Sequence, residues 1–556
     1  MRVEAGEGMK TAGEVWLVGA GPGDPGLLTM RGKDVLERAD VVVHDRLANP
    51  ALLRLAPRAR FIDVGKSPDG QGYRQEEINR ILIDLAREGN MVVRLKGGDP
   101  FIFGRGGEEA LALVAAGIRF GVVPGVTAAS GCAAWAGVPL THRGLASSLA
   151  LVTGHEDPGK VPQVEWRRLA AAADTLVVYM GVGRLELIVT ELLAGGRPAD
   201  EPVLLVQEGT RATQKVVSSR LEELPARARE GGIEPPALLV VGKVAALRRS
   251  LAWYENLPLS GCRIALTRPL VMFGEDARPV GHAGHPFAGW DLADWQIAGA
   301  EVDVYHLLRL EMPADPGPLR QAARQAGCFR WILFTSAAGV EAFFHALAEE
   351  GADARALAGC RVGVVGPGTA AALRRHGIRP DLVPRPYTVD ALVAEVGRRL
   401  APGDRVLLPR SDLAASQAEP LLRAGAEEVR EVTAYHTAAD REEAARLARD
   451  VVAGGVDVLV LTSASTARMA AQEVLAGWAG GVPGGVEPPL AGMESSLAAG
   501  AGLPLVVAIG PVTARACREA GWPVAAVAPT HDREGLLRAV VDLWQGRRVP
   551  RRPGVT

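Results

Sequence analysis

The chain has 556 residues, of which 48% are hydrophobic and 23% charged, and its formal net charge is −2. This composition predicts a folded protein of three or four domains at roughly 150 residues each. The near-neutral net charge gives no indication that the protein binds nucleic acid or a membrane surface. The five scattered cysteines form no C-x-x-C pair, which argues against a disulfide framework and a thiolate zinc site. Without an apolar leader or a membrane-length apolar run, we expect a cytoplasmic location.

The first hundred residues alternate between strand-like and helix-like segments. The runs "VWLVGA" (15–20), "DVVVHD" (40–45) and "MVVRLKGGDP" (91–100) read as strands, and 27–39 reads as a helix. In 75–90, the residues Ile78, Ile81, Leu82 and Leu85 have the spacing of one helix face. This alternation predicts the α/β fold class, with a mostly parallel sheet covered by helices.

The loop "GAGPGDPG" (19–26) leaves the first strand and contains the G-x-G-x-x-G pattern of a dinucleotide site. Such a site offers backbone N–H groups to a pyrophosphate, whereas Pro22 and Pro25 carry none. The loop therefore favours a nucleoside without a phosphate, such as S-adenosylmethionine. Two alternatives stay open: a nucleotide-dependent oxidoreductase that uses this loop, and a tight turn that binds nothing.

Further glycine turns follow the later strands. Gly97 and Gly98 permit close backbone approach, and Asp99 beside them can bind an ammonium group or ribose hydroxyls. The strands "TLVVYMG" (175–181) and "LLVQEGT" (204–210) also end at glycine. Because ligands of open α/β sheets bind at strand ends, we expect these turns to converge on one site.

These stretches, together with "KGGDPFIFGRGGEE", "VVPGVTAASGCAAWAGVPLTHR" and "VTGH", resemble the uroporphyrinogen-III C-methyltransferases of the tetrapyrrole methylase family over residues 14–250. The resemblance implies a two-lobed α/β module, usually a homodimer. It also implies transfer of two methyl groups from S-adenosylmethionine to uroporphyrinogen III, which gives precorrin-2 for siroheme or cobalamin.

The resemblance also assigns residues. Asp45 would be the proton acceptor and Lys66 the proton donor, although Asp45 also suits a strand-end cap and Lys66 a solvated surface position. The substrate's carboxylates would meet arginines, for which Arg46, Arg105 and Arg143 are candidates, each equally suited to a surface salt bridge. The implied cofactor contacts are Pro22, Gly97, Gly98, Asp99, Ile102, Thr127, Ala128, Met180 and Gly209.

A boundary near 253–261 separates this module from an internally repeated second half. The stretches 364–377 and 508–521 match in their G-P-x-T-A pattern. An apolar strand that ends in a Thr-Ser pair precedes each of them. Two copies of strand, hydroxyl turn, helix, strand and glycine turn predict two similar α/β lobes.

The tract 262–545 resembles uroporphyrinogen-III synthase, on "RIALTRP", "WILFTSAAGVEAFF", "VLLPRSD", "VTAYHT" and the two repeats. The resemblance implies a two-lobed α/β fold, with about 300–435 as the inserted lobe, and closure of hydroxymethylbilane to uroporphyrinogen III. Tyr435 would donate a proton to the leaving hydroxyl. The candidate carboxylate-binding hydroxyls are Thr335, Ser336, Thr369, Thr462, Ser463 and Thr513.

Two alternatives stay open for this half. The hydroxyl residues equally suit helix N-caps, and the module is alternatively an inactive docking unit. The tract 270–298 is more irregular than the helix expected there. Its H-x-x-H pair, His282 and His285, lies in Gly/Pro-rich sequence without a third ligand, so we expect a loop and no metal.

Overall fold

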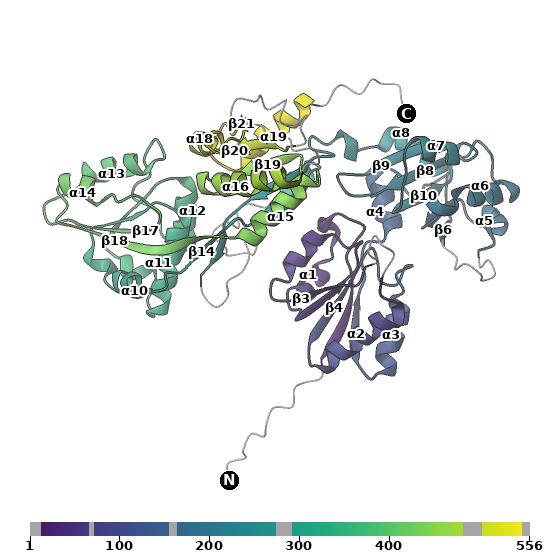
Figure 1. The fold of residues 1–556 in the computed structure, drawn as a ribbon, viewed down its shortest axis with the longest axis horizontal. Helices are drawn as coiled ribbons and strands as arrows, with labels where there is room; N and C mark the ends of the chain where they lie inside the picture. Colours follow the sequence, from purple (N-terminus) through teal and green to yellow (C-terminus); the bar gives the residue numbers. More distant parts are fainter. Residues whose placement is uncertain (1–12, 66–71, 155–163, 274–291, 482–502, 548–556) are drawn as a thin grey trace, which may run out of the picture. The chain divides into compact units, whose positions relative to one another are not determined.

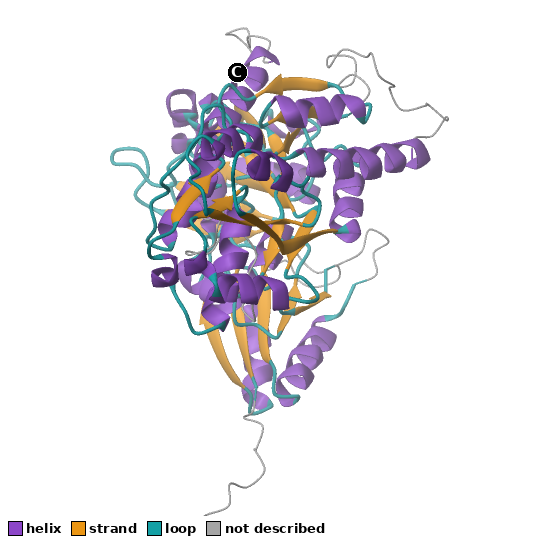
Figure 2. Ribbon diagram, turned by 90° about the vertical axis from the view of Figure 1, so that its left-hand side faces the viewer, coloured by secondary structure: helices purple, strands orange, loops and turns teal. Residues whose placement is uncertain are grey.

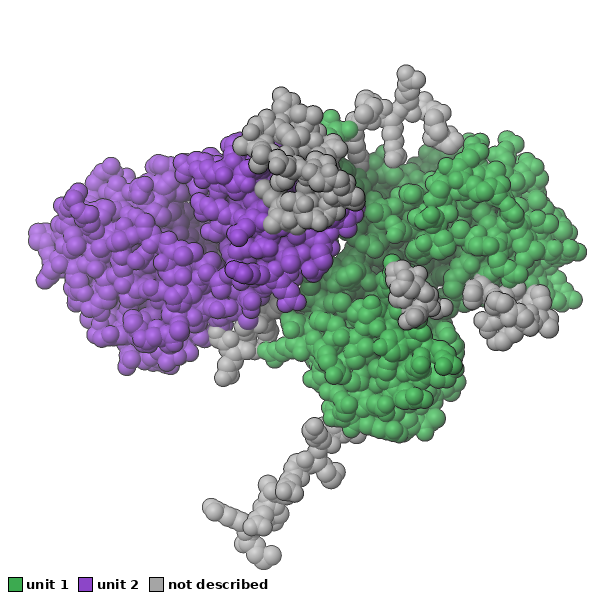
Figure 3. Space-filling view, viewed as in Figure 1, with its two compact units in different colours: residues 1–262, 295–301, 544–556 green, residues 263–294, 302–543 purple. Residues whose placement is uncertain are grey.

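The computed structural model describes residues 13–65, 72–154, 164–273, 292–481 and 503–547. Contacts divide the chain into two compact units (Figure 3). Unit 1 comprises 1–262, 295–301 and 544–556, and unit 2 comprises 263–294 and 302–543. Lys66, His282 and His285 lie outside the described residues.

The first lobe of unit 1 is a parallel sheet in the order β3-β2-β4-β1-β5 (Figure 1). Its strands are β1 (Glu14–Gly19), β2 (Val41–His44), β3 (Arg60–Asp63), β4 (Met91–Lys96) and β5 (Arg119–Val123). Its helices are α1 (Met30–Leu36), α2 (Gln75–Arg87) and α3 (Gly106–Ala115).

Helices cover both faces of this sheet, and for that reason its strands are apolar without interruption. Val41 and Val43 pack toward α2 and α3, while Val42 packs toward α1, as the alternation of side chains along a strand requires. The predicted helix face is confirmed, since α2 buries Ile78, Leu82 and Leu85.

The second lobe of unit 1 is a mixed sheet in the order β6-β7-β10-β8-β9, in which only β6 and β7 run parallel. Its strands are β6 (Leu149–Thr153), β7 (Thr175–Tyr179), β8 (Pro202–Gln207), β9 (Lys215–Arg220) and β10 (Ala237–Val241). Helices α5 (Trp166–Ala172), α6 (Leu185–Ala194) and α7 (Leu224–Glu230) pack on one face. Helix α4 (Ala128–Trp135) packs on the other, and α8 (Arg248–Leu251) follows near the end of this lobe.

Unit 2 contains two sheets, and the first has the order β13-β11-β19-β20-β21. Its strands are β11 (Arg263–Thr267), β13 (Glu301–Tyr305), β19 (Val458–Leu461), β20 (Leu505–Ala508) and β21 (Val524–Val527). Helices α15 (Arg441–Val452), α16 (Ala464–Gly481) and α18 (Pro511–Glu519) share its core. Strand β11 pairs with β19, so "RIALTRP" joins the C-terminal part of the chain as the resemblance implies.

The second sheet of unit 2 has the order β12-β14-β18-β17-β15-β16. Its strands are β12 (Leu270–Met272), β14 (Leu308–Glu311), β15 (Trp331–Phe334), β16 (Arg361–Val364), β17 (Arg405–Ser411) and β18 (Glu428–Ala439). Helices α10 (Gly317–Arg324), α11 (Ala337–Glu349) and α12 (Pro367–Arg375) pack on one face, and α13 (Val389–Gly397) and α14 (Ala418–Arg423) on the other. Two further helices are α9 (Ala293–Ile297) and α19 (Arg533–Arg547).

The sheets and helices of both units confirm the predicted α/β fold class, which Figure 2 shows as strands flanked by helices. Both halves of the predicted repeat have the same local fold. A Thr-Ser pair follows β15 and β19, and a Gly-Pro pair begins α12 and α18 after β16 and β20. No helix among the described residues is both long enough and apolar enough to cross a membrane.

Candidate functional site

Most amide groups of the loop after β1 are already bonded within the protein. Ala20 donates to the carbonyl of Lys96, and Gly21 donates to that of Gly98. Asp24 donates to Oγ1 of Thr210 at 2.9 Å, and Gly26 donates to the Asp24 carboxylate at 2.7 Å. With Leu27 also engaged and no N–H on either proline, the loop is not built as a pyrophosphate cradle.

Glycines bring the ends of β1, β4 and β5 into close contact. A Cβ on Gly19 would lie 2.5 Å from Cα of Gly125, and one on Gly125 would lie 2.2 Å from the carbonyl oxygen of Gly98. Gly21 and Gly98 form an antiparallel bridge. Only residues without a Cβ allow backbones to approach this closely, so these glycines fix the meeting point of three loops.

Helix α4 is where these loops meet those of the second lobe. A Cβ on Gly131 of α4 would lie 2.5 Å from Cγ of Pro22, and one on Gly209 would lie 2.5 Å from Sγ of Cys132. At Gly98, by contrast, an added Cβ would have 3.9 Å to the nearest atoms of Thr127 and Ala128. The structure therefore gathers Pro22, Gly98, Thr127, Ala128 and Gly209 around the start of one helix.

The remaining predicted cofactor residues lie on the same loops. Asp99 accepts N–H groups from Phe101 at 2.8 Å and Gly125 at 3.0 Å, so its carboxylate ties the loop after β4 to the loop after β5. Gly97 packs against Leu47, and Ile102 donates to the carbonyl of Asp99. Met180 follows β7 with its side chain 53% exposed.

Sequence reasoning missed Tyr179, the last residue of β7. Its hydroxyl lies 2.6 Å from Oγ1 of Thr127 and accepts the N–H of Ala129 at 2.9 Å. Its ring lies 4.9 Å from that of Phe103. Tyr179 therefore links the second sheet to the first turn of α4, and its position directly before Met180 was the available signal.

Strained backbone is concentrated in the same loops. Among the described residues, five that are not glycine have a positive φ: Phe103, Arg105, Met180, Glu208 and Thr210. All five lie in the loops that follow β4, β7 and β8. Because such conformations persist only where the surrounding structure enforces them, their concentration makes these loops a candidate functional site.

Asp45, the predicted proton acceptor, follows β2 and lies at the edge of a buried charge cluster. Its Oδ1 is 2.5 Å from Nη2 of Arg94, whose side chain is 2% exposed. Glu109 of α3 is completely buried, and its Oε1 accepts from Arg94 Nε at 3.1 Å and Lys96 Nζ at 2.9 Å. Burial lowers the pKa of Lys96, and the charge of Arg94 adds to this, while Glu109 and Asp45 oppose it.

The three predicted arginines are all exposed. Arg46 follows Asp45, and a Cβ on Gly65 would lie 2.8 Å from its Cβ. Arg105 pairs with Glu108 at 2.7 Å, and Arg143 lies in the turn closed by the bridge between His142 and Ala146. Arg46 thus lies beside Asp45, whereas Arg105 pairs with a glutamate three residues further along the chain.

In unit 2, several predicted hydroxyls act as helix caps. Ser336 Oγ accepts the N–H of Gly339 at 3.0 Å, and Ser463 Oγ accepts that of Thr466 at 3.1 Å. Thr462 donates to the carbonyl of Thr267 at 2.8 Å. Thr369 and Thr513 are buried in the first turns of α12 and α18, and Thr335 is half-buried after β15. The N-cap alternative therefore describes Ser336 and Ser463 directly.

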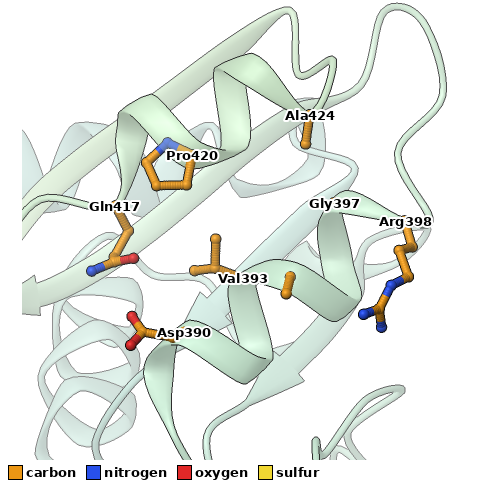
Figure 4. Close-up of a pocket in the computed structure, with 8 residues that line it drawn as sticks. Asp390, Val393, Gly397, Arg398, Gln417, Pro420 and Ala424 are labelled. Atoms are coloured by element: carbon orange, nitrogen blue, oxygen red, sulfur yellow. The ribbon is translucent and has the colours of Figure 1, made fainter.

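Tyr435 on β18 is 8% exposed, and its hydroxyl lies 3.0 Å from Oγ of Ser336. Burial raises the pKa of this phenol, while hydrogen bonds with Ser336 and Ser411 oppose the shift in part. The pair places a neutral hydroxyl donor at the start of α11. A separate groove between α13 and α14, lined by residues including Asp390 and Gln417, contains none of the predicted site residues (Figure 4).

The fold and these sites define an α/β enzyme of two modules. The first has a glycine-rich loop that is poorly suited to bind a phosphate, and the second has hydroxyl groups at the ends of its strands. Residues 14–225 match the model of the tetrapyrrole (corrin/porphyrin) methylases. Residues 293–538 match that of uroporphyrinogen-III synthase HemD.

Individual relatives agree with both matches. The chain is 36% identical over 455 residues to the porphyrin biosynthesis protein HemD of Ruminiclostridium josui, which covers 82% of this chain and 87% of that protein. It is 54% identical over 253 residues to the siroheme synthase of Azotobacter vinelandii, which covers 45% of this chain and 54% of that protein. The chain thus spans about half the length of that siroheme synthase.

Among solved structures, the uroporphyrin-III C-methyltransferase of Thermus thermophilus complexed with S-adenyl homocysteine is 46% identical. The match covers 42% of this chain and 100% of that one, with a TM-score of 0.37.

The chain belongs to the tetrapyrrole methylases through its N-terminal module and to the uroporphyrinogen-III synthases through its C-terminal module. The prediction of a bifunctional enzyme of tetrapyrrole biosynthesis, which joins a uroporphyrinogen-III C-methyltransferase to a uroporphyrinogen-III synthase, is confirmed.

Proposed function

We propose that unit 2 closes hydroxymethylbilane to uroporphyrinogen III, and that unit 1 methylates this product twice with S-adenosylmethionine to give precorrin-2. The observation that carries the assignment of the cofactor is the loop after β1, in which the amides of Ala20, Gly21, Asp24 and Gly26 are bonded within the protein and the two prolines have none. A dinucleotide needs such amides for its pyrophosphate, and a sulfonium nucleoside does not. The oxidoreductase alternative is therefore disfavoured.

The residues present fit this cofactor. Gly98 has no side chain, and an added Cβ there would come no closer than 3.9 Å to Thr127 and Ala128, so the main chain stays accessible to an adenosyl group. Asp99 retains acceptor capacity beside its two backbone bonds and suits ribose hydroxyls or the ammonium group. Pro22, Gly97, Ile102, Met180 and Gly209 would complete the surroundings. When bound, the cofactor supplies an electrophilic methyl group.

The protein's own part in methyl transfer is orientation and proton management. A pyrrole carbon of a porphyrinogen is electron-rich, so it attacks the methyl group without further activation once the two are aligned. The ring system then loses a proton, and Asp45 is the base that accepts it. Lys66 would return a proton, and Arg46, Arg105 and Arg143 would bind substrate carboxylates.

In unit 2, the proposed proton donor to the leaving hydroxyl is Tyr435. Its raised pKa keeps the phenol protonated at neutral pH, and the contact with Ser336 Oγ orients it. A hydroxyl whose oxygen accepts a cap bond can still donate its O–H, so the hydroxyls at these strand ends suit the carboxylates of a linear tetrapyrrole. We further propose that unit 1 forms a homodimer.

Calorimetric titration of the full chain tests the cofactor assignment. We expect S-adenosylhomocysteine to bind with micromolar affinity or better and NADH to show no saturable heat. Saturable NADH binding that S-adenosylhomocysteine does not displace would contradict it. The variant Pro22→Gly, which restores an N–H and adds flexibility, serves as a probe of the loop, and it should weaken S-adenosylhomocysteine binding without gaining NADH binding.

A further inference from the structure

Beneath Asp45 lies a buried charge cluster of Arg94, Lys96 and Glu109. The proposed methyl transfer assigns no role to any of the three. Arg94 and Lys96 project from the same side of β4, two residues apart, toward Glu109 on α3. Their side chains are 2%, 3% and 0% exposed. Burying three charges is costly, so a sheet that needed only packing would carry apolar residues here.

The hydrogen bonds of Glu109 are unevenly distributed. Its Oε1 accepts from Arg94 Nε, Lys96 Nζ and, at 3.3 Å, Gln75 Nε2. Its Oε2 is buried without a hydrogen-bond partner among the described residues. Glu109 thus holds both cations from one oxygen, and Arg94 in turn extends its Nη2 to Asp45, the one member that reaches solvent with 29% exposure.

When Asp45 is counted with Arg94, Lys96 and Glu109, the charges balance, with two cations and two carboxylates. The described charged groups around Asp45 are Arg94 and Lys96 on β4, Glu108 and Glu109 on α3, Asp63 on β3, and His44 and Arg46 beside it in sequence. Lys96 and Arg94 contact the same oxygen of Glu109, and Arg94 alone of these two cations contacts Asp45 in the ion pairs of the described residues.

We infer that Lys96 and Glu109 are positioning residues for methyl transfer: Lys96 anchors the Glu109 carboxylate, and Glu109 fixes Arg94 so that it orients the Asp45 carboxylate. This inference rests on the proposed function, which makes Asp45 the proton acceptor. The side chains of both residues act through Arg94 on Asp45.

The test measures kcat/KM for uroporphyrinogen III against pH in the full chain, together with calorimetric affinity for S-adenosylhomocysteine. For Lys96→Met, we expect kcat to fall by roughly threefold or more while KM stays within about twofold, because Glu109 loses one of the two cations that hold it. For Glu109→Gln, we expect kcat to fall by roughly tenfold or more while KM stays within about twofold, because Asp45 loses its orientation.

Glu201→Gln is the matched control. Glu201 pairs with Arg197 at 2.8 Å in a buried ion pair, and its Oε2 likewise lacks a hydrogen-bond partner among the described residues. This variant should lower the melting temperature and leave the pH profile unchanged. If Glu109→Gln does not fold, Lys96→Met still decides the question, since it leaves Arg94 paired with both carboxylates.

Each outcome is decisive. Profiles of folded Lys96→Met and Glu109→Gln that superimpose on the wild type, while Asp45→Asn is inactive, would overturn the inference and leave the proposed function intact. If Asp45→Asn retains full activity, the proposed proton acceptor is wrong and this inference fails with it. If no methylated product forms in the wild type, the proposed function itself fails.

Discussion

The hydroxyl of Tyr179 lies 2.6 Å from Oγ1 of Thr127, and it also accepts the N–H of Ala129 at 2.9 Å. One phenol at the end of β7 thereby occupies two groups at the start of α4, where Pro22, Gly98 and Gly209 converge. The contact ties the start of α4 to the second sheet at the proposed cofactor site, so we expect its removal to weaken cofactor binding.

For Tyr179→Phe, we expect S-adenosylhomocysteine affinity to fall about fivefold and unfolding free energy to fall by about 1 kcal/mol, since a half-buried amide loses its acceptor. Calorimetry and urea denaturation measure the two effects. Tyr305→Phe is the matched control, because it removes a hydroxyl that donates to Asp450 at 2.7 Å in unit 2. An equal loss of affinity in both variants would show that the effect is not local.

Gly98 and Gly117 form a second matched pair. Both are left-handed, with φ of 68° and 69°, but an added Cβ at Gly117 meets nothing within 4 Å. Each change to alanine should cost about 1–2 kcal/mol of stability from backbone strain. Only Gly98→Ala should lose S-adenosylhomocysteine binding, because its methyl group enters the proposed cofactor site. Equal binding by both variants would place the cofactor elsewhere.

Asp24 predicts a pH dependence of stability. Burial raises the pKa of its carboxyl, and the N–H of Gly26 offsets this only in part. Because the folded pKa lies above the unfolded value, the wild type should lose stability relative to Asp24→Asn as pH rises through the folded pKa. Urea unfolding of both proteins at pH 4 and 7 measures the difference, and a wild type that gains on the variant as pH rises would have the wrong sign.

Tyr435→Phe separates the two activities. Without its phenolic proton, we expect the rate of closure of hydroxymethylbilane to uroporphyrinogen III to fall roughly a hundredfold, leaving the type I isomer that forms without the enzyme. Methylation of supplied uroporphyrinogen III should be unchanged. Ser336→Ala should weaken closure less and cost about 1 kcal/mol of stability through its lost N-cap. Normal closure by Tyr435→Phe would exclude the tyrosine as proton donor.

The α/β class, the two modules and the strand-end loops could be predicted from the sequence, because apolar periodicity and glycine spacing are local signals. The helix face of Ile78, Leu82 and Leu85 followed from spacing alone. The prolines of the first loop predicted a poor phosphate site, since a missing N–H can be read from the residue type. The roles carried over by resemblance, including Asp45, Lys66 and Tyr435, stay predictions.

Other features could not be read from the sequence because they depend on tertiary contacts. Glu109 is one of two adjacent glutamates at the start of a helix, and nothing local distinguishes it from the exposed Glu108. Its burial against Arg94 and Lys96 arises only when α3 packs on β4. Thr210, with φ of 73°, likewise shows its role only once the loop after β8 meets Asp24.

The most direct test of the account supplies the full chain with hydroxymethylbilane and S-adenosylmethionine and identifies the tetrapyrrole product by mass and absorption. We expect the product to be dimethylated precorrin-2 of the type III series, because its formation requires both modules to act in sequence. An unmethylated product, or one confined to the type I isomer, would contradict it.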